Sequence, residues 1–376
     1  MRNKIVTNIV IICLFILINS SGVIGAEAAG FKPVESDRIP EILTLISERI
    51  KSNYERIKTW QGEGSIRESY IYEGPRAEKV FKADTIGEGE IPSKIKKHID
   101  AYVEFSIDVE KDFMYVNFNS NSPKPLQYMD FETKRDLGAK RTLDLRRTIR
   151  TPEYQIDCSG HRRRRGVVIE QRAVKQARPM NDLMCDVEII PVYDPMKTCK
   201  AFKDEIWELF PQLTEIIMER GKYSIDDFDL TIEERKFGGI TEYRIKLPSK
   251  AGTPENFLYL SSNMVFSSDK GFNIISYQYV DQNGIQLRNQ AWDYDNVDGV
   301  YVPINVTQKD FNWPEGSLSS EKIVSFKNLH VNHVIPPGTF EYTNLGLKDG
   351  DVFVDEIMDK EYRYEVATKQ LKPVEK

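Results

Sequence analysis

The stretch WDYDNVDGVYVP, from Trp292 to Pro303, crowds three aspartates and a glycine just ahead of an apolar run. An EF-hand calcium loop needs glycine at its sixth position and a bidentate glutamate at its twelfth. Counted from Asp293, glycine comes seventh and the twelfth residue is Ile304, so the stretch is not such a loop. It fits a β-hairpin with an Asp298-Gly299 turn. The return strand is expected to carry four apolar residues on one face: Val300, Val302, Ile304 and Val306.

Similar turn signals divide the rest of the second half into short alternating segments. Gly238-Gly239 and Asn283-Gly284 are two of them. Because such turns are tight, each strand is expected to pair with the next one along the chain. In the first half, residues 102–118 alternate in the same way and predict a further hairpin. The 18 tyrosines and 18 phenylalanines also favour a β-rich chain.

One amphipathic helix is expected ahead of the strands. Apolar residues recur at helical spacing from Ile39 to Lys58, with Pro40 in the first turn and Ser36 or Asp37 as the N-cap. A single helix with an apolar stripe is marginal in water, so this stripe should pack against the sheet.

A second helix is expected from Lys200 to Gly221, with a kink or break near Pro211. Its large apolar side chains cover a wider arc than one stripe requires. The excess is expected either to border an apolar cavity that faces a ligand, with Trp207 and Phe210 at its edge, or to pack against the arginine-rich inserted region.

The N-terminus has the three parts of a secretory signal. A basic start is followed by an apolar core from Ile5 to Ile18 and by small residues around Ala26 and Ala28. The core has 14 residues, fewer than the 18 or more of a membrane span. We therefore expect residues 1–28 to be a cleaved signal peptide and the mature protein to be exported and periplasmic. An uncleaved inner-membrane anchor is the alternative.

Positive charge is concentrated in one region, although the net charge of the chain is −6. From Lys134 to Arg178 there are 14 Lys or Arg residues against 5 Asp or Glu. For an exported protein, an anionic membrane surface or an acidic envelope protein is a more natural partner than nucleic acid. The expected contact residues are Arg162, Arg163, Arg164 and Arg165. A solvated hairpin tip between the strand-like segments 153–159 and 167–174 is the alternative.

The sequence lacks the common catalytic motifs. It has no nucleophile elbow, no zinc-protease motif, no paired C-x-x-C and no phosphate loop. After signal cleavage the three cysteines Cys158, Cys185 and Cys199 allow at most one internal disulfide. His330 and His333 form an H-x-x-H, but on a strand a spacing of three places them on opposite faces. We therefore expect no enzyme, no cofactor and no metal site.

The order of these elements resembles a known family. A signal peptide and an amphipathic helix precede DKGFNIISYQYVDQNG (residues 269–284) and WDYDNVDGVYVPINVTQKDF (residues 292–311). This pattern is similar to that of the LolA-like superfamily of outer-membrane lipoprotein carriers and sorting proteins, over roughly residues 40–115 and 195–331. The resemblance implies an α+β, mainly antiparallel β fold: an incomplete (half) β-barrel with amphipathic helices covering its concave face. Residues 29–376 would form a single domain with an arginine-rich insertion at about 134–180.

The same resemblance implies a function. In the family an apolar cavity between sheet and helices takes acyl chains, so we expect a carrier or sorting factor for lipids or lipoproteins at the cell envelope. A periplasmic sensor or regulatory interaction protein with the same half-barrel is the alternative. Aromatic residues on the elements that should surround the cavity could line it, or could be ordinary core residues: Phe105, Tyr115, Phe202, Trp207, Phe210, Tyr277, Tyr279 and Trp292.

Overall fold

The structure, a computed structural model, describes residues 30–83, 91–119, 126–133, 136–140, 144–162, 168–177, 230–247, 261–281 and 283–374. Several predicted features lie outside these residues: the signal peptide, the helix from Lys200 to Gly221 with Phe202, Trp207 and Phe210, the arginines 163–165, and Cys185 and Cys199.

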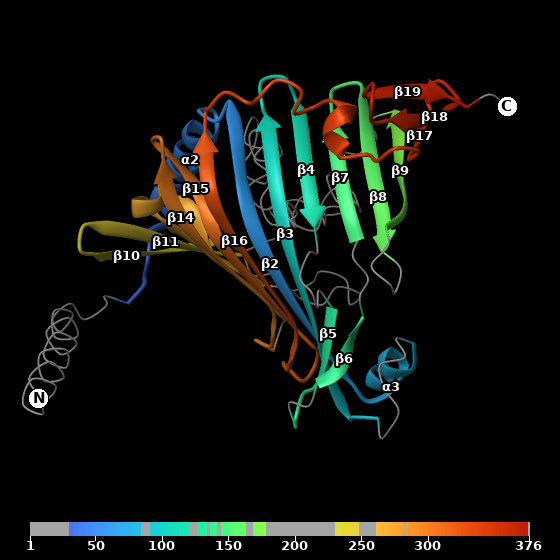
Figure 1. The fold of residues 1–376 in the computed structure, drawn as a ribbon. Helices are drawn as coiled ribbons and strands as arrows, with labels where there is room; N and C mark the ends of the chain where they lie inside the picture. The colour runs from blue at the N-terminus through green and yellow to red at the C-terminus, as the bar shows by residue number, and fades with distance from the viewer. Residues whose placement is uncertain are drawn as a thin grey trace, which may run out of the picture.

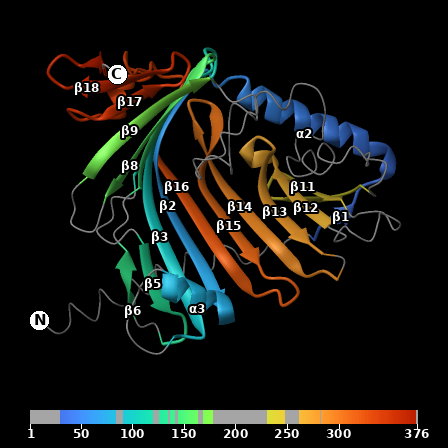
Figure 2. The same ribbon diagram turned by 90° about the vertical axis from the view of Figure 1, so that its right-hand side faces the viewer.

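Nineteen strands of the described residues form one large curved sheet that does not close (Figures 1 and 2). Those of the first half are β1 (Lys32–Pro33), β2 (Thr59–Glu73), β3 (Lys94–Asp108), β4 (Phe113–Asn119), β5 (Leu126–Asp130), β6 (Asp136–Lys140), β7 (Asp144–Arg150), β8 (Tyr154–Arg162) and β9 (Val168–Ala177). Those of the second half are β10 (Thr231–Phe237), β11 (Ile240–Leu247), β12 (Ser261–Ser267), β13 (Asn273–Val280), β14 (Gln286–Val297), β15 (Val300–Phe311), β16 (Leu318–Val331), β17 (Val352–Asp355), β18 (Lys360–Glu365) and β19 (Gln370–Pro373).

Strand pairing follows chain order over much of the sheet. Strands β10 to β16 pair in sequence, and β16 then pairs with β2, which pairs with β3. Beyond β3 the sheet continues through β4, β7, β8 and β9, with β5 and β6 branching from the other end of β3. Among the described strands, β9 with β17 is the single parallel pair. The predicted mainly antiparallel, open sheet is thus present.

The hairpin predicted at the Asp298-Gly299 turn is confirmed as β14–β15. Asp298 and Gly299 have φ values of 52° and 83°, which gives the mirror-image turn that suits the twist of two paired strands. One detail was wrong: the register passes from Asp293–Asn305 to Tyr294–Pro303, so Ile304 has no partner opposite. Ile304 is only half-buried as a result, whereas the three valines of the predicted set are buried.

The first helix is confirmed as α2 (Ile39–Tyr54), with Pro40 in its first turn, although it ends at Tyr54 rather than at the expected Lys58. The predicted cap was wrong, because neither Ser36 nor Asp37 makes a side-chain cap. The short 3-10 helix η1 (Ser36–Arg38) leads directly into α2, and the backbone N–H of Ile39 donates to the carbonyl of Ser36 instead. The apolar stripe of α2 packs against the sheet in the main hydrophobic cluster.

Other elements were not expected from the sequence. Helix α3 (Gly74–Ala83) joins β2 to β3, and two short 3-10 helices occur at η4 (Ser268–Lys270) and η5 (Tyr342–Leu345). The C-terminal strands pack with β7 to β9 in a second apolar cluster that contains Ile149, Ile156, Cys158, Leu345 and Phe353. No helix of the described residues combines the length and apolarity that a membrane crossing would require.

Cys158 is a buried residue of this second cluster, 2% exposed. Burial raises the pKa of the Cys158 thiol to about 12, so about one thiol in ten thousand is ionised at pH 8. In a Cys185→Ser/Cys199→Ser variant of the mature protein, which lacks the signal peptide and its Cys13, we expect no reaction with Ellman's reagent at pH 8 while the protein is folded. Unfolding in guanidinium chloride should release one reactive thiol. Rapid labelling of the native variant would contradict the buried position.

Candidate functional site

The face of the sheet that packs against α2, called the α2 face below, carries the main apolar cluster. Residues directly opposite each other in a sheet share a face. Trp292 of β14 is opposite Val306 of β15, which is opposite Val324 of β16. These three side chains share one buried cluster with Ile42 and Ile46 of α2.

Farther along the same strands, the α2 face becomes polar. Stepping two residues at a time from Trp292 keeps the side chains on this face, because successive residues alternate. The strand register places two rows of polar residues there, one step and two steps beyond Trp292. The two rows together, eight residues in all, are called the polar row below. The first contains Gln290, Gln308, Lys322 and Glu68, and the second contains Arg288, Asp310, Ser320 and Tyr70.

Asp310 is the centre of one half of the polar row. Its Oδ1 accepts from Arg288 Nε at 2.6 Å, and its Oδ2 accepts from Gln308 Nε2 at 2.9 Å and from Ser320 Oγ at 2.8 Å. Gln290 Nε2 in turn donates to Gln308 Oε1 at 2.7 Å. Donors from three strands therefore fix the Asp310 carboxylate.

Glu68 is the centre of the other half. Lys322 Nζ lies 2.8 Å from Glu68 Oε1, and Tyr70 Oη donates to Oε2 at 2.8 Å. The Glu68 side chain is 5% exposed and that of Lys322 17%. A buried ion pair must recover the cost of removing two charges from water, so its presence on an inward-packed face calls for a reason.

A pocket of about 190 Å³ opens on the polar row. It is lined by Glu68, Tyr70, Gln308, Asp310, Ser320, Glu321 and Lys322. The wall combines hydrogen-bond donors, acceptors and both signs of charge. These side chains can hydrogen-bond the polar group of a ligand.

Two of the predicted cavity residues border the polar row. Tyr277 is opposite Gln290 and Tyr279 is opposite Arg288, and the two tyrosine rings are stacked with centroids 6.4 Å apart. Burial raises the pKa of Tyr279 to about 12, so its hydroxyl stays protonated at neutral pH and can donate a hydrogen bond.

Phe105 and Trp292 lie in the apolar part of the α2 face. Phe105 is 3% exposed and packs edge-on against Trp60 with ring centroids 4.7 Å apart. Tyr115 does not join them: its neighbour Val116 pairs with Phe105, so Tyr115 points to the other face. There it belongs to the cluster under the C-terminal strands. The structure therefore brings four predicted residues to one face and places Tyr115 elsewhere.

The arginine run is described only at its start. Arg162 ends β8, which pairs with β9 as the flanking segments predicted. The contact of Arg162 to Arg165 with an anionic surface stays a prediction.

The polar row itself was missed in the sequence. Within β14, the alternation of Gln286, Arg288 and Gln290 ahead of Trp292 did signal a face that changes from polar to apolar. The partners on β2, however, come from a pairing between residues about 250 positions apart, for which no local signal exists.

The histidine argument was wrong. Strand β16 ends at Val331, and Asn332 has φ 62°, so the chain turns and brings the His333 ring back to the His330 ring, with centroids 5.0 Å apart. Within the described ranges there is no group of three or more His, Cys, Asp or Glu side chains arranged to hold a metal ion.

No family model matches the sequence, and no curated protein matches it. Similar solved structures include a LolA superfamily protein from Nitrosomonas europaea, at 7% identity and TM-score 0.33, covering 80% of this chain and 98% of that one. A DUF1329 family protein from Desulfovibrio piger is 10% identical with TM-score 0.34, covering 81% and 98%. A putative outer membrane lipoprotein-sorting protein domain from Vibrio parahaemolyticus is 10% identical with TM-score 0.31, covering 81% and 97%.

Two of these three structures are described as a LolA superfamily protein and as a putative lipoprotein-sorting domain. TM-scores of 0.31 to 0.34 are too low to transfer a function. The functional argument depends on this chain's own residues.

Proposed function

We propose that the protein is an exported binding protein for lipids or lipoprotein acyl chains, acting as a carrier or sorting factor at the cell envelope. One observation carries the proposal: the α2 face changes from apolar at Trp292 to polar at Gln290 and Arg288. The same strands run through the apolar part and the polar part of this face. An amphiphilic ligand needs these two surfaces side by side. Its acyl chain would follow the apolar part, and its polar group would lie in the pocket of the polar row.

The apolar part is occupied when α2 is in place. Ile42, Ile46 and Ile50 are each no more than 3% exposed, so an acyl chain can enter only if α2 moves. Full burial of a chain of about 15 carbons would contribute roughly 12 kcal/mol, at about 0.8 kcal/mol per CH₂. Displacing α2 would offset part of this gain, which makes release feasible.

The contacts of α2 suggest how it would move. Near its C-terminal end, Asn53 both donates to the Tyr301 carbonyl at 2.9 Å and accepts from the Tyr301 N–H at 2.8 Å. Near its N-terminal end, Arg38 of η1 lies 3.8 Å from Glu234, and the Arg38 side chain is 44% exposed. The Glu234 side chain is 17% exposed, and the chain just before η1 is also held, since β1 pairs with β10 and the Val34 N–H donates to the Ile232 carbonyl at 2.9 Å. We therefore propose α2 as a cover that moves off the sheet between two attached ends.

Tyr279→Ala tests the site. Loss of this side chain should remove about 1.4 kcal/mol of apolar contact with the ligand and weaken binding of a fluorescent fatty acid about tenfold. Gln278→Ala is the matched control, since the neighbouring residue points to the other face, and it should bind as the wild type does. Fluorescence titration measures both.

Native mass spectrometry after lipid extraction provides the second measurement. A co-purified lipid that the extract identifies would support the carrier. Absence of lipid, together with no fatty-acid binding by the wild type, would refute it. A co-purified envelope protein in place of lipid would favour the sensor.

A further inference from the structure

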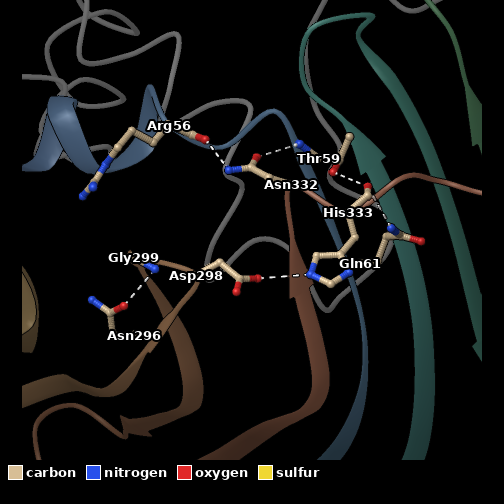
Figure 3. A network of polar contacts seen from close by, with 8 residues as sticks. All are labelled: Arg56, Thr59, Gln61, Asn296, Asp298, Gly299, Asn332 and His333. Carbon is tan, nitrogen blue, oxygen red and sulfur yellow. Dashed lines mark hydrogen bonds and ion pairs between the residues drawn. The ribbon is translucent and has the colours of Figure 1, made fainter.

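His330 and His333 lie together at one end of the sheet, away from the polar row. Figure 3 shows the surroundings of His333: the loop after α2, the start of β2, the turn between β14 and β15, and the segment after β16. Both histidines are exposed, so an ion from solution can reach them without any movement of the fold.

Backbone contacts hold His333 in place. The His333 carbonyl accepts from Thr59 Oγ1 at 2.7 Å, and Asn332 Oδ1 accepts from the Lys58 N–H at 2.7 Å. Asn332 Nδ2 also donates to the Arg56 carbonyl at 2.8 Å (Figure 3). The backbone at His333 is therefore held by the fold.

Asp298 selects the nitrogen of His333 that remains available. His333 Nε2 lies 3.2 Å from Asp298 Oδ2 (Figure 3). When Nε2 carries the proton and donates to this carboxylate, Nδ1 keeps a free lone pair. A carboxylate that orients a histidine in this way is the usual second partner of a metal-binding imidazole.

The spacing of the two rings also fits a shared ion. With metal–nitrogen bonds of about 2.0–2.1 Å, two imidazole ligands have ring centroids roughly 5 Å apart in the tetrahedral geometry of Zn²⁺ and roughly 4.5 Å apart at the angle of about 90° of tetragonal Cu²⁺. The His330 and His333 centroids are 5.0 Å apart with an interplanar angle of 42°. Stacked rings would be parallel, and these are not.

We propose that His330 and His333 form a two-histidine site for a divalent transition-metal ion, with Asp298 as a positioning residue and water completing the coordination. Imidazole suits Cu²⁺, Ni²⁺ and Zn²⁺, and Cu²⁺ binds most tightly in that series. The ion joins the end of β16 to the segment that follows it. Since that segment also holds the loop after α2, binding stabilises the attachment of α2 to the sheet.

Titration of the full chain with Cu²⁺, followed by calorimetry and by electron paramagnetic resonance, tests the proposal. The wild type should bind one Cu²⁺ with nitrogen ligands, and Cu²⁺ should raise its Tm. His330→Gln and His333→Gln should each weaken binding at least tenfold and abolish the rise in Tm. Asp298→Asn should weaken binding about tenfold.

His98→Gln is the matched control. His98 lies on β3, where its Nδ1 is 2.8 Å from Ser69 Oγ, and its variant should bind Cu²⁺ as the wild type does. Mg²⁺, which prefers oxygen ligands, should not bind. The proposal is wrong if a His330→Gln/His333→Gln double variant binds Cu²⁺ as tightly as the wild type, or if the wild type shows no preference for Cu²⁺ over Mg²⁺. Both histidines are exposed, so loss of binding will not reflect unfolding, and circular dichroism checks this.

Discussion

Replacing Phe105 with alanine is expected to lower the free energy of unfolding by about 3 to 5 kcal/mol. The ring is 3% exposed and sits between Trp60 and Phe326, with centroid distances of 4.7 Å and 5.9 Å. The strand β2 is shaped to receive it: a Cβ added at Gly62 would come within 3.2 Å of Phe105 Cζ. A cavity left here could not collapse readily, because Trp60 and Phe326 are themselves held by the sheet.

Phe237→Ala is the matched control for this prediction. Phe237 ends β10 at a hairpin and is half-buried, with Arg235 lying 5.0 Å from its ring centroid. Its removal should cost about 1 kcal/mol or less. Urea unfolding with a common m-value measures both variants.

Stability and fatty-acid affinity of Phe105→Ala together distinguish a core residue from a cavity-lining residue. As a core residue, its loss destabilises the fold and leaves fatty-acid affinity unchanged in the folded fraction. If Phe105 lined an open cavity, the loss of stability would be small and the affinity would fall. The second result would contradict the packing described above.

The spacing of apolar residues and the turn residues correctly predicted a helix and a pair of strands that follow each other in the chain. The β14–β15 hairpin followed from Asp298-Gly299 flanked by alternating residues, and α2 followed from its 3.6-residue periodicity. Two of the errors came from a local change of one residue in or next to a strand. A bulge at Ile304 and a left-handed Asn332 each changed which face a side chain occupies, and neither has a clear signature in a single sequence.

Contacts distant in the sequence could not be predicted. The pairing of β16 with β2 places Lys322 opposite Glu68, and the parallel pairing of β9 with β17 brings the C-terminal strands to the sheet. The sequence does show that Glu68 lies in an alternating segment. It does not show that Glu68 is buried, so the polar half of the α2 face became visible only in the fold.

Lys322→Met is expected to cost about 3 kcal/mol of stability, at the lower end of the range for removing one partner of a buried ion pair. The substitution leaves the Glu68 carboxylate 5% exposed with Tyr70 as a remaining donor. Stability falls because the negative charge of Glu68 stays buried without the positive charge of Lys322 beside it. The double variant Glu68→Leu/Lys322→Met removes both charges and should be at least as stable as the wild type, within about 1 kcal/mol.

The same two strands supply a matched control. Lys327 and Glu63 are also opposite each other on β16 and β2, with Lys327 Nζ 3.4 Å from Glu63 Oε2. This pair points to the other face, and its side chains are 62% and 32% exposed. Lys327→Met should cost less than about 1 kcal/mol. Equal losses at the two lysines would show that burial of Glu68 has no energetic consequence.

The double variant also tests why the charges are there. Two apolar side chains would fit an inward-packed face at least as well as an ion pair, so a fold selected for stability alone has no need of Glu68 and Lys322. If the pair serves the pocket of the polar row, Glu68→Leu/Lys322→Met should fold stably and yet bind a fatty acid or a co-purified lipid at least tenfold more weakly. If the variant binds as tightly as the wild type, the polar row is a structural feature of the sheet. The polar group of the ligand must then lie elsewhere on the α2 face.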